Sequence, residues 1–489
     1  MRIRRHELDP EGRRLPVKLD RTSNGEFWPV PFPAQAAAAK RLAHARADDF
    51  SRSLGLTRRG FLKTLPGAAA TLLAMNDAFA RFDKVGGGFA VPKQAALEPE
   101  AAEEILGKRE FIFDVQTHHV DPQGSWRRLT NRWSYILRVM PQAWCGDGNI
   151  ECFSTEHFVR EIFLDSDTDM AVLSAVPAAP EDNPLSTAEA AATRAIVEAL
   201  EGDHRLLIHS LVLPNLPGAI EDMARQKEQY RIAAWKTYTQ WGPDGKGYWL
   251  DDERHGLPFI ARARALGVKV ICVHKGLPLF GFDYEYSTCR DIGAVARLYP
   301  DMTFIVYHSG YEPWRTEGPY DPARAEGGVD SLIRSLQDNG IPPNRNVYAE
   351  LGTTWRLLMR DPDEAAHVLG KLFKHVGEDR VLWGTDSIWY GSPQDQIQAF
   401  RTFQISERFR DRYGYPEITP AQRAKVFGLN AASGPYPVAI EELRRRARMD
   451  RVGRLQEAYR EAPEPSFATY GPRTRREFLA LYRLTGGRP

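Results

Sequence analysis

The 489-residue chain is poor in cysteine, in net charge and in long apolar runs. Its four cysteines form no CxxC pair, which excludes a zinc knuckle and a thioredoxin-like motif. A formal net charge of +1 gives no global field that would favour nucleic acid or an anionic membrane surface. Residues 65–75 are moderately apolar, but this run is too short and too rich in glycine and alanine to span a bilayer. We therefore expect neither a nucleic acid nor a membrane as partner.

The first 80 residues have the parts of an export signal in order. Arg58 and Arg59 form a twin-arginine pair, the weakly apolar run follows, and Ala78-Phe79-Ala80 resembles a small-x-small cleavage site. More than fifty residues precede the pair, so either the true start lies downstream or this leading region is unusually long. The alternative is that the two arginines open an ordinary amphipathic helix.

The export interpretation divides the chain. It predicts that residues 1–80 are an N-terminal extension with a twin-arginine-like signal and that residues 81–109 are a linker. The protein would then be exported to the periplasm by a twin-arginine route, and it would be cytoplasmic if the signal is not used.

Residues 110–435 alternate short apolar runs with stretches of helical spacing. The predicted strands are 110–116, 169–176, 205–214, 231–238, 268–274, 302–308, 346–351 and 380–386. Continuous apolar runs are typical of buried parallel strands, and eight of them alternating with helices predict an α/β fold, a (β/α)₈ TIM-like barrel. A doubly wound open sheet is the alternative, but no glycine-rich nucleotide turn follows the first strand.

Residues 436–489 carry a mixed-charge amphipathic pattern. The pattern predicts a helical C-terminal tail that packs on the barrel or on a partner subunit, so a homodimer is one expected assembly.

Polar side chains occur where the predicted strands end. They are Gln116 and His118 in the first strand, Lys236 in the fourth, His274 in the fifth, His308 in the sixth and Asp386 in the eighth. In a barrel the C-terminal ends of the strands meet at one mouth. Imidazoles and a carboxylate that converge there can hold a catalytic Zn²⁺ ion with three protein ligands and an open position for water. We therefore predict His118, His274 and Asp386 as metal ligands.

These residues and their order resemble the amidohydrolase-related family (amidohydrolase 2), which includes aminocarboxymuconate-semialdehyde and resorcylate decarboxylases. The matching stretches are Asp114-Val-Gln-Thr-His118, Val273-His274, Tyr307-His308-Ser-Gly, Leu382-Trp-Gly-Thr-Asp386 and Phe427-Gly-Leu-Asn430. The resemblance implies a TIM-like barrel that binds a divalent metal, with zinc as the expected ion. It also implies that Asp386 orients or deprotonates the attacking water and that His308 acts as acid, base or electrophile.

Gln116 departs from this pattern, because the family has histidine or glutamate at the position. An amide oxygen is a poorer ligand for a zinc-like ion than imidazole or carboxylate. Gln116 therefore binds weakly, hydrogen-bonds the metal-bound water, or marks a site that has lost its ion; we expect a retained but weakened site. Lys236 and Glu350 are the predicted substrate-binding residues. Lys236 either holds a substrate carboxylate as a point charge or pairs with Glu350 across the barrel mouth. His119 should face away from the site in an extended strand.

The predicted function is that of a metal-dependent hydrolase which attacks a small organic carbonyl or carboxylate substrate with metal-activated water. A non-oxidative decarboxylase of the same family is the alternative reaction, because the same metal would hold a substrate carboxylate. A catalytically inactive barrel retained for binding is the alternative of another class, and Gln116 is the feature that supports it.

Overall fold

The computed structural model describes residues 9–124, 126, 150–180, 183–243, 245–278 and 283–484. Much of the segment from residue 121 to residue 160 lies outside these ranges.

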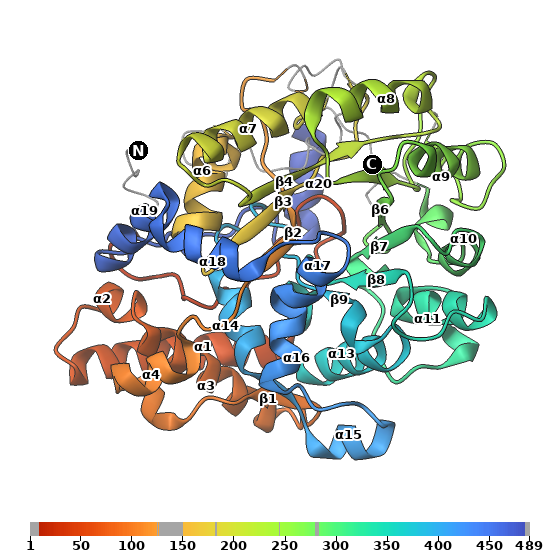
Figure 1. Cartoon of the computed structure of the whole chain (residues 1–489). Helices are drawn as coiled ribbons and strands as arrows, with labels where there is room; N and C mark the ends of the chain where they lie inside the picture. The colour runs from red at the N-terminus through yellow and green to blue at the C-terminus, as the bar shows by residue number, and fades with distance from the viewer. Residues whose placement is uncertain are drawn as a thin grey trace.

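Eight parallel strands form a barrel at the centre of the molecule (Figure 1). They are β2 (Phe113–Thr117), β3 (Met170–Leu173), β4 (Leu206–Leu211), β5 (Ala234–Tyr238), β6 (Val270–His274), β7 (Thr303–Tyr307), β8 (Val347–Glu350) and β9 (Val381–Leu382). Each strand pairs with the next in the chain. Backbone hydrogen bonds then join the first strand to the segment that begins with β9: Val115 N donates to Trp383 O (3.0 Å), and Asp386 N donates to Gln116 O (2.9 Å). The predicted strands and the TIM-like barrel are confirmed.

Helices alternate with the strands, as predicted. They are α7 (Thr187–Ala199), α8 (Ala219–Tyr230), α9 (Gly256–Ala265), α10 (Ile292–Leu298), α11 (Gly328–Asp338), α13 (Pro362–His375) and α14 (Gln394–Thr402). The start of α7 shows how local sequence sets a boundary. Ser186 Oγ accepts from Glu189 N, and the Glu189 carboxylate accepts from Ser186 N. This capping box satisfies two backbone donors that would otherwise have no partner in the helix.

Residues 34–106 pack against the barrel rather than forming a detached extension (Figure 1). This part contains α1 (Ala34–Ser53), α2 (Arg58–Leu62), α3 (Leu65–Arg81), β1 (Gly87–Phe89) and α4 (Pro99–Leu106). Leu72, Met75 and Phe79 of α3 are buried in the hydrophobic core that the barrel strands share. Strand β1 pairs antiparallel with β10 (Phe403–Ile405), which follows α14. Apolar side chains from both sides of residue 80 thus meet in one core, and the division of the chain at residue 80 stays a prediction.

The arginine pair takes part in this packing. Helix α2 begins at Arg58, and Thr57 caps it by accepting from Gly60 N. Arg58 donates to Gly12 O (2.8 Å) and His44 O (3.0 Å), while Arg59 donates to Pro465 O in the C-terminal tail. The pair therefore opens a helix, which was the alternative interpretation, and the export route stays a prediction.

Residues 9–33, here called the N-terminal arm, contain no helix or strand and run into the barrel mouth. Lys18 Nζ donates to Tyr390 O (2.8 Å) and lies 3.2 Å from Asp395 of α14. Arg360 donates to Lys18 O (3.1 Å), and Ser23 N donates to Pro472 O (3.0 Å). The arm is thus held between the barrel and the C-terminal tail.

The tail is helical, as predicted, with α18 (Ile440–Met449), α19 (Arg451–Glu461) and α20 (Arg475–Leu484). A buried ion pair between Arg205 and Asp450 (2.6 Å) fastens it to the start of β4. The tail therefore packs on the barrel of its own chain, and a homodimer stays a prediction. None of the helices in the described residues has the length and apolar character needed to cross a membrane.

Candidate metal centre at the barrel mouth

The predicted site residues gather at the C-terminal ends of the strands, and all of them are buried. His118 follows β2, His274 ends β6, His308 follows β7 and Asp386 follows β9. His118 Nε2 lies 3.0 Å from Asp386 Oδ1. Gln116 Nε2 is 3.1 Å from the same oxygen and 3.4 Å from Nε2 of both His118 and His308. Barrel closure therefore brings together side chains that are far apart in the sequence.

The backbone at this mouth is strained. His308, Thr353 and Asp386 have left-handed φ values of 64°, 53° and 59°. Such conformations cost non-glycine residues on the order of 1–3 kcal/mol each and concentrate at functional sites. Glu350 fixes one of these turns, because its carboxylate accepts from the backbone N–H of His308 (3.0 Å) and of Gly352.

Each of the three imidazoles uses one nitrogen for a backbone carbonyl. His118 Nδ1 donates to Ser174 O (2.6 Å), His308 Nδ1 to Gly352 O (2.7 Å) and His274 Nε2 to Leu277 O (3.0 Å). Since a carbonyl only accepts, these nitrogens carry the ring protons, and each ring offers a lone pair on its other nitrogen.

Burial keeps these rings neutral. It lowers the pKa of His118 to about 4 and the pKa values of His274 and His308 well below their ordinary value. A neutral imidazole whose second nitrogen bonds a carbonyl is the form that binds metal ions. A neutral His308 with its proton on Nδ1 can act as ligand or base at Nε2, but it cannot donate a proton there. The predicted role of His308 as acid, base or electrophile stays a prediction.

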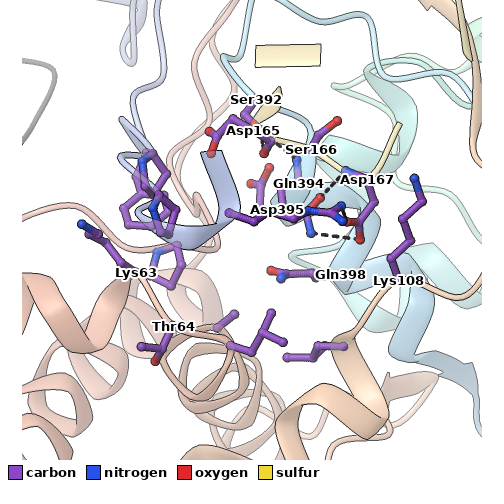
Figure 2. A pocket seen from close by; sticks show the side chains of 18 of the residues that line it. Lys63, Thr64, Lys108, Asp165, Ser166, Asp167, Ser392, Gln394, Asp395 and Gln398 are labelled. Atoms are coloured by element: carbon purple, nitrogen blue, oxygen red, sulfur yellow. Dashed lines mark hydrogen bonds and ion pairs between the residues drawn. The ribbon is translucent and has the colours of Figure 1, made fainter. Parts of the chain in front are cut away.

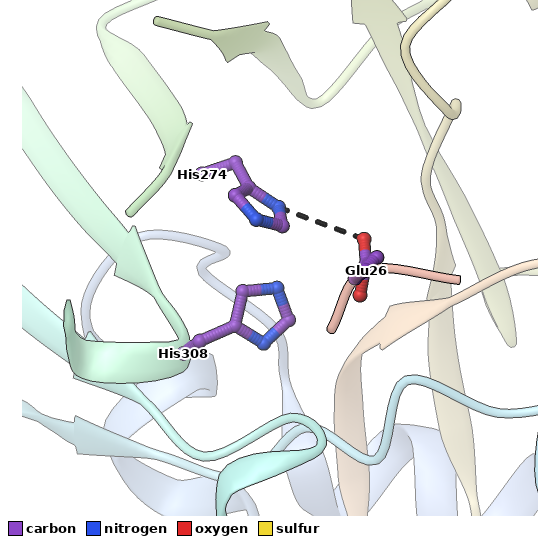
Figure 3. Close-up of side chains that lie close together, drawn as sticks. All are labelled: Glu26, His274 and His308. Atoms are coloured by element: carbon purple, nitrogen blue, oxygen red, sulfur yellow. Dashed lines mark ion pairs between the residues drawn. The ribbon is translucent and has the colours of Figure 1, made fainter. Parts of the chain in front are cut away.

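A fourth member of the site, Glu26, was not predicted from the sequence. It comes from the N-terminal arm, and its Oε1 lies 3.8 Å from His274 Nδ1 (Figure 3). Glu26, His274 and His308 offer ligand atoms that all lie within 4.8 Å of one another. Among the described residues, they are the group of three histidine, cysteine, aspartate or glutamate side chains with ligand atoms this close together. His118 and Asp386 form a separate close pair, with the Gln116 amide in contact with both of them and with His308. The shared ligation by His118, His274 and Asp386 stays a prediction.

Several buried polar atoms of the site lack a protein partner. His274 Nδ1, Gln116 Oε1 and Lys236 Nζ make no hydrogen bond to the protein. Burial raises the pKa of Asp386 to about 7, and burial together with the Asp386 charge raises that of Glu26 to about 8. Imidazole lone pairs and carboxylates that face one another without protons between them repel, and a cation removes this repulsion. The donor set therefore fits a divalent metal ion.

The other predicted residues take different places. Lys236 lies in β5 with Nζ 3.4 Å from the centre of the Tyr307 ring, and burial lowers its pKa to about 7. Lys236 Nζ makes no hydrogen bond to Glu350, and both Glu350 oxygens accept backbone N–H groups. Glu350 thus positions the His308 turn, and its contact with substrate stays a prediction. His119 Nε2 instead bonds Thr193 Oγ1 (2.8 Å), consistent with its predicted structural role.

A cavity of about 440 Å³ lies elsewhere, lined by residues of α3, α4, α14 and α19 (Figure 2). Two of its carboxylates have cationic partners in the protein. Asp167 pairs with Arg401 (3.0 Å) and Arg460 (2.9 Å), and Asp395 pairs with Lys18. Because these two carboxylates are already paired with cations, this cavity is a weaker candidate for chemistry than the barrel mouth.

Comparison with known proteins identifies one matching family. The sequence model described as amidohydrolase matches residues 162–433. Among curated proteins no sequence matches the chain.

Three solved structures are similar in part. An uncharacterized TIM-barrel protein from Bordetella bronchiseptica has 16% identity, covers 69% of this chain and 99% of its own, and has a TM-score of 0.41. An amidohydrolase from Mycobacterium avium subsp. paratuberculosis has 14% identity, coverage of 67% and 99%, and a TM-score of 0.39. A dihydropyrimidinase from Brevibacillus agri has 14% identity, coverage of 67% and 71%, and a TM-score of 0.37. Likenesses at this level are no evidence for a shared reaction.

Proposed function

The chain belongs to the amidohydrolase family, whose model matches more than half of its residues, and we propose that it is a metal-dependent hydrolase of a small organic substrate. The observation that carries the proposal is the arrangement of His118, His274 and His308. Each ring is fixed by a backbone carbonyl and offers a lone pair at the barrel mouth, beside the carboxylate of Asp386.

His118, His274 and Asp386 would hold the ion, with Gln116 as a weaker neutral neighbour and zinc as the expected metal. A divalent ion in this place supplies charge that polarises a carbonyl and lowers the pKa of bound water towards about 7. Asp386 would take the proton of the attacking water. Its Oδ2 accepts from Thr353 Oγ1 (2.5 Å) and Asn24 Nδ2 (3.1 Å), which fixes the carboxylate. A pKa of about 7 suits a general base near neutral pH.

Lys236 gives specific support to decarboxylation as the second candidate. Its buried amine has no hydrogen-bond partner in the protein and lies in a barrel strand near the site. A protonated amine in this position would bind a substrate carboxylate. Hydrolysis and decarboxylation would share the metal centre and differ in the bond that breaks.

The two reactions are separated by their products. Purified protein loaded with Zn²⁺ should incorporate ¹⁸O from labelled water into the products of esters, lactones or amides. Release of CO₂ from hydroxybenzoate-like acids without such incorporation would favour the decarboxylase. If the protein binds no divalent metal and a chelator does not change its activity, both the hydrolase and the decarboxylase proposals are overturned. The catalytically inactive barrel retained for binding would then be the remaining hypothesis.

A matched pair of variants tests the role of Asp386. Asp386→Asn should lower kcat/KM by about 100-fold or more, because a positioned base typically contributes 10²–10⁴-fold. Asp301→Asn makes the same change at an exposed residue paired with Arg264, and it should retain activity. Equal activity of the two variants would remove Asp386 from the mechanism.

A further inference from the structure

We propose that Glu26, which the N-terminal arm carries into the barrel mouth, is a ligand of the metal centre, so that the centre is complete only while the arm is in place. The inference rests on the proposed function, since it requires that the centre holds a divalent ion. It adds a ligand from outside the barrel strands, at a position that the strand-end motifs do not include.

The first argument is the way in which Glu26 is held. Asn24 Nδ2 donates to Glu26 Oε2 (2.7 Å) and also to Asp386 Oδ2 (3.1 Å). Glu26 N in turn donates to Asn24 Oδ1 (3.1 Å), which closes a tight turn. The amide of Asn24 thus links the two carboxylates and fixes one oxygen of Glu26, while the other oxygen, Oε1, faces His274 (Figure 3).

The second argument is the contact between Glu26 and His274. The 3.8 Å separation of Oε1 and Nδ1 is too long for a hydrogen bond, and the ring proton is on Nε2, which donates to Leu277 O. Two electron-pair donors therefore face each other, and His274 Nδ1 has no other partner in the protein. Zinc bonds of about 2.0–2.2 Å place two ligand atoms of one ion roughly 3–4 Å apart. The observed separation agrees with shared ligation.

The third argument is charge. Gln116 places a neutral amide where the metal centre would benefit from a carboxylate or an imidazole. Glu26 approaches the same cluster from the arm, within 4.8 Å of ligand atoms of His274 and His308. Its carboxylate compensates for the charge that Gln116 does not provide, which explains how the site can keep an ion despite that substitution.

The arm is also built to hold this carboxylate in position. Arg356 donates to Asp20 O (2.9 Å), Arg360 donates to Lys18 O (3.1 Å), and Lys18 pairs with Asp395 inside the protein. The C-terminal tail contacts the arm from the other side, where the Trp28 and Phe478 rings lie 4.7 Å apart. A ligand fixed in this way loses little conformational entropy when the ion binds.

The test is the Zn²⁺ affinity of the full-length chain, measured by competition with a chromogenic chelator. Glu26→Gln keeps the size of the side chain and an acceptor for Asn24 but removes the charged ligand, so affinity should fall by about 100-fold or more, beyond the 10–100-fold effect of residues that only support a ligand. Glu26→Asp keeps the charge with a shorter reach and should give an intermediate affinity. Glu11→Gln makes the same change at an exposed position of the same arm and should have no effect.

Each result decides a separate point. If the wild type binds one Zn²⁺ and Glu26→Gln binds it equally well, this inference fails while the proposed function stands. If the wild type binds no Zn²⁺, the proposed function fails first. Unchanged affinity together with faster turnover in Glu26→Gln would show that the arm blocks the substrate site, which also overturns the inference. Thermal melting of the metal-free proteins tests folding, and if Glu26→Gln does not fold, wild-type affinity in the folded Glu26→Asp variant would count against ligation.

Discussion

Replacement of Lys18 by methionine should release the arm from the barrel without touching the metal centre. The Lys18 side chain is 4% exposed and that of Asp395 is 0% exposed. Nζ lies 3.2 Å from Asp395 Oδ1 and donates to Tyr390 O (2.8 Å), and Lys18 N donates to Asp395 Oδ2 (3.0 Å). Methionine keeps most of the apolar stem of lysine and removes only the charge and its hydrogen bonds.

The expected loss of stability follows from the Asp395 carboxylate, which is left buried without its cation. Removal of one partner of a buried ion pair costs about 3–5 kcal/mol, because the other charge stays buried without compensation. The nearest remaining cation is Arg356, whose Nη1 is 4.0 Å from Asp395 Oδ2, so we expect the lower end of this range. About 3 kcal/mol corresponds to a factor of roughly 10² in the equilibrium for release of the arm. The double variant Lys18→Met with Asp395→Asn should recover part of the loss, since the stranded charge is gone.

Hydrogen exchange measures this effect locally. Backbone amides of residues 15–27 should exchange faster in Lys18→Met, while amides of the barrel strand β6 keep their protection. Zn²⁺ affinity should fall in parallel, because Glu26 leaves with the arm. Unchanged exchange over residues 15–27, with a free energy of unfolding within about 1 kcal/mol of the wild type, would refute the reasoning.

Three further predictions concern the centre and the arm. Gln116→His should tighten Zn²⁺ binding about tenfold or more, because imidazole is the better ligand, and chelator competition measures it; unchanged affinity would place residue 116 away from the ion. Zn²⁺ affinity should rise between about pH 6 and pH 8. The pKa values of about 7 for Asp386 and about 8 for Glu26 mean that both carboxyl groups are protonated in the metal-free site below this range. These protons must leave when the ion binds, so a higher pH favours binding. Calorimetry in buffers of different ionisation enthalpy counts these protons, and none released would contradict the prediction. If the twin-arginine signal is used, fractionation should find the protein in the periplasm, and its intact mass should still include residues 9–80.

The barrel was predictable because its strands have a strong local signal. Residues 268–274 form a nearly continuous apolar run, and β6 occupies Val270–His274. The prediction was least accurate at the last strand, where residues 380–386 were expected and β9 ends at Leu382. Beyond that point the chain closes the ring by separate hydrogen bonds and turns sharply, with Asp386 in a left-handed conformation. The spacing of apolar residues does not predict such a turn, although the turn positions the Asp386 carboxylate.

The composition of helix α3 is typical both of an export signal and of a closely packed helix, and for this reason the sequence predicts a signal there. Alanine, glycine and leucine at residues 65–75 suit the apolar part of a signal, but they also suit a helix that packs closely against another helix. Small residues of α1, among them Ala39 and Ala43, are buried in the same core as Ala69 and Leu72 of α3. The sequence alone does not tell whether a small, apolar helix is removed or packed, since the difference lies in the partner surface.

Glu26 had no signal of its own. Ser23-Asn24-Gly25-Glu26 reads as a turn, and a polar turn in an arginine-rich leader suggests a solvated loop. Its function depends on the tertiary contacts of Lys18, Arg356 and the tail, which bring the turn to the barrel mouth. Neither spacing nor composition could have revealed it.

The proposed role of the arm makes a prediction about cleavage near Ala80. Cleavage there would remove Glu26 and the buried side chains Leu72, Met75 and Phe79, each of which stabilises the fold by about 1.5–3 kcal/mol through burial. The remaining barrel would have only the neutral Gln116 amide in place of the lost Glu26 carboxylate. A chain that begins after residue 80 should thus be less stable than the full-length protein, and where it folds it should bind Zn²⁺ as weakly as Glu26→Gln. Full Zn²⁺ affinity in such a truncated chain would show that the arm does not complete the site.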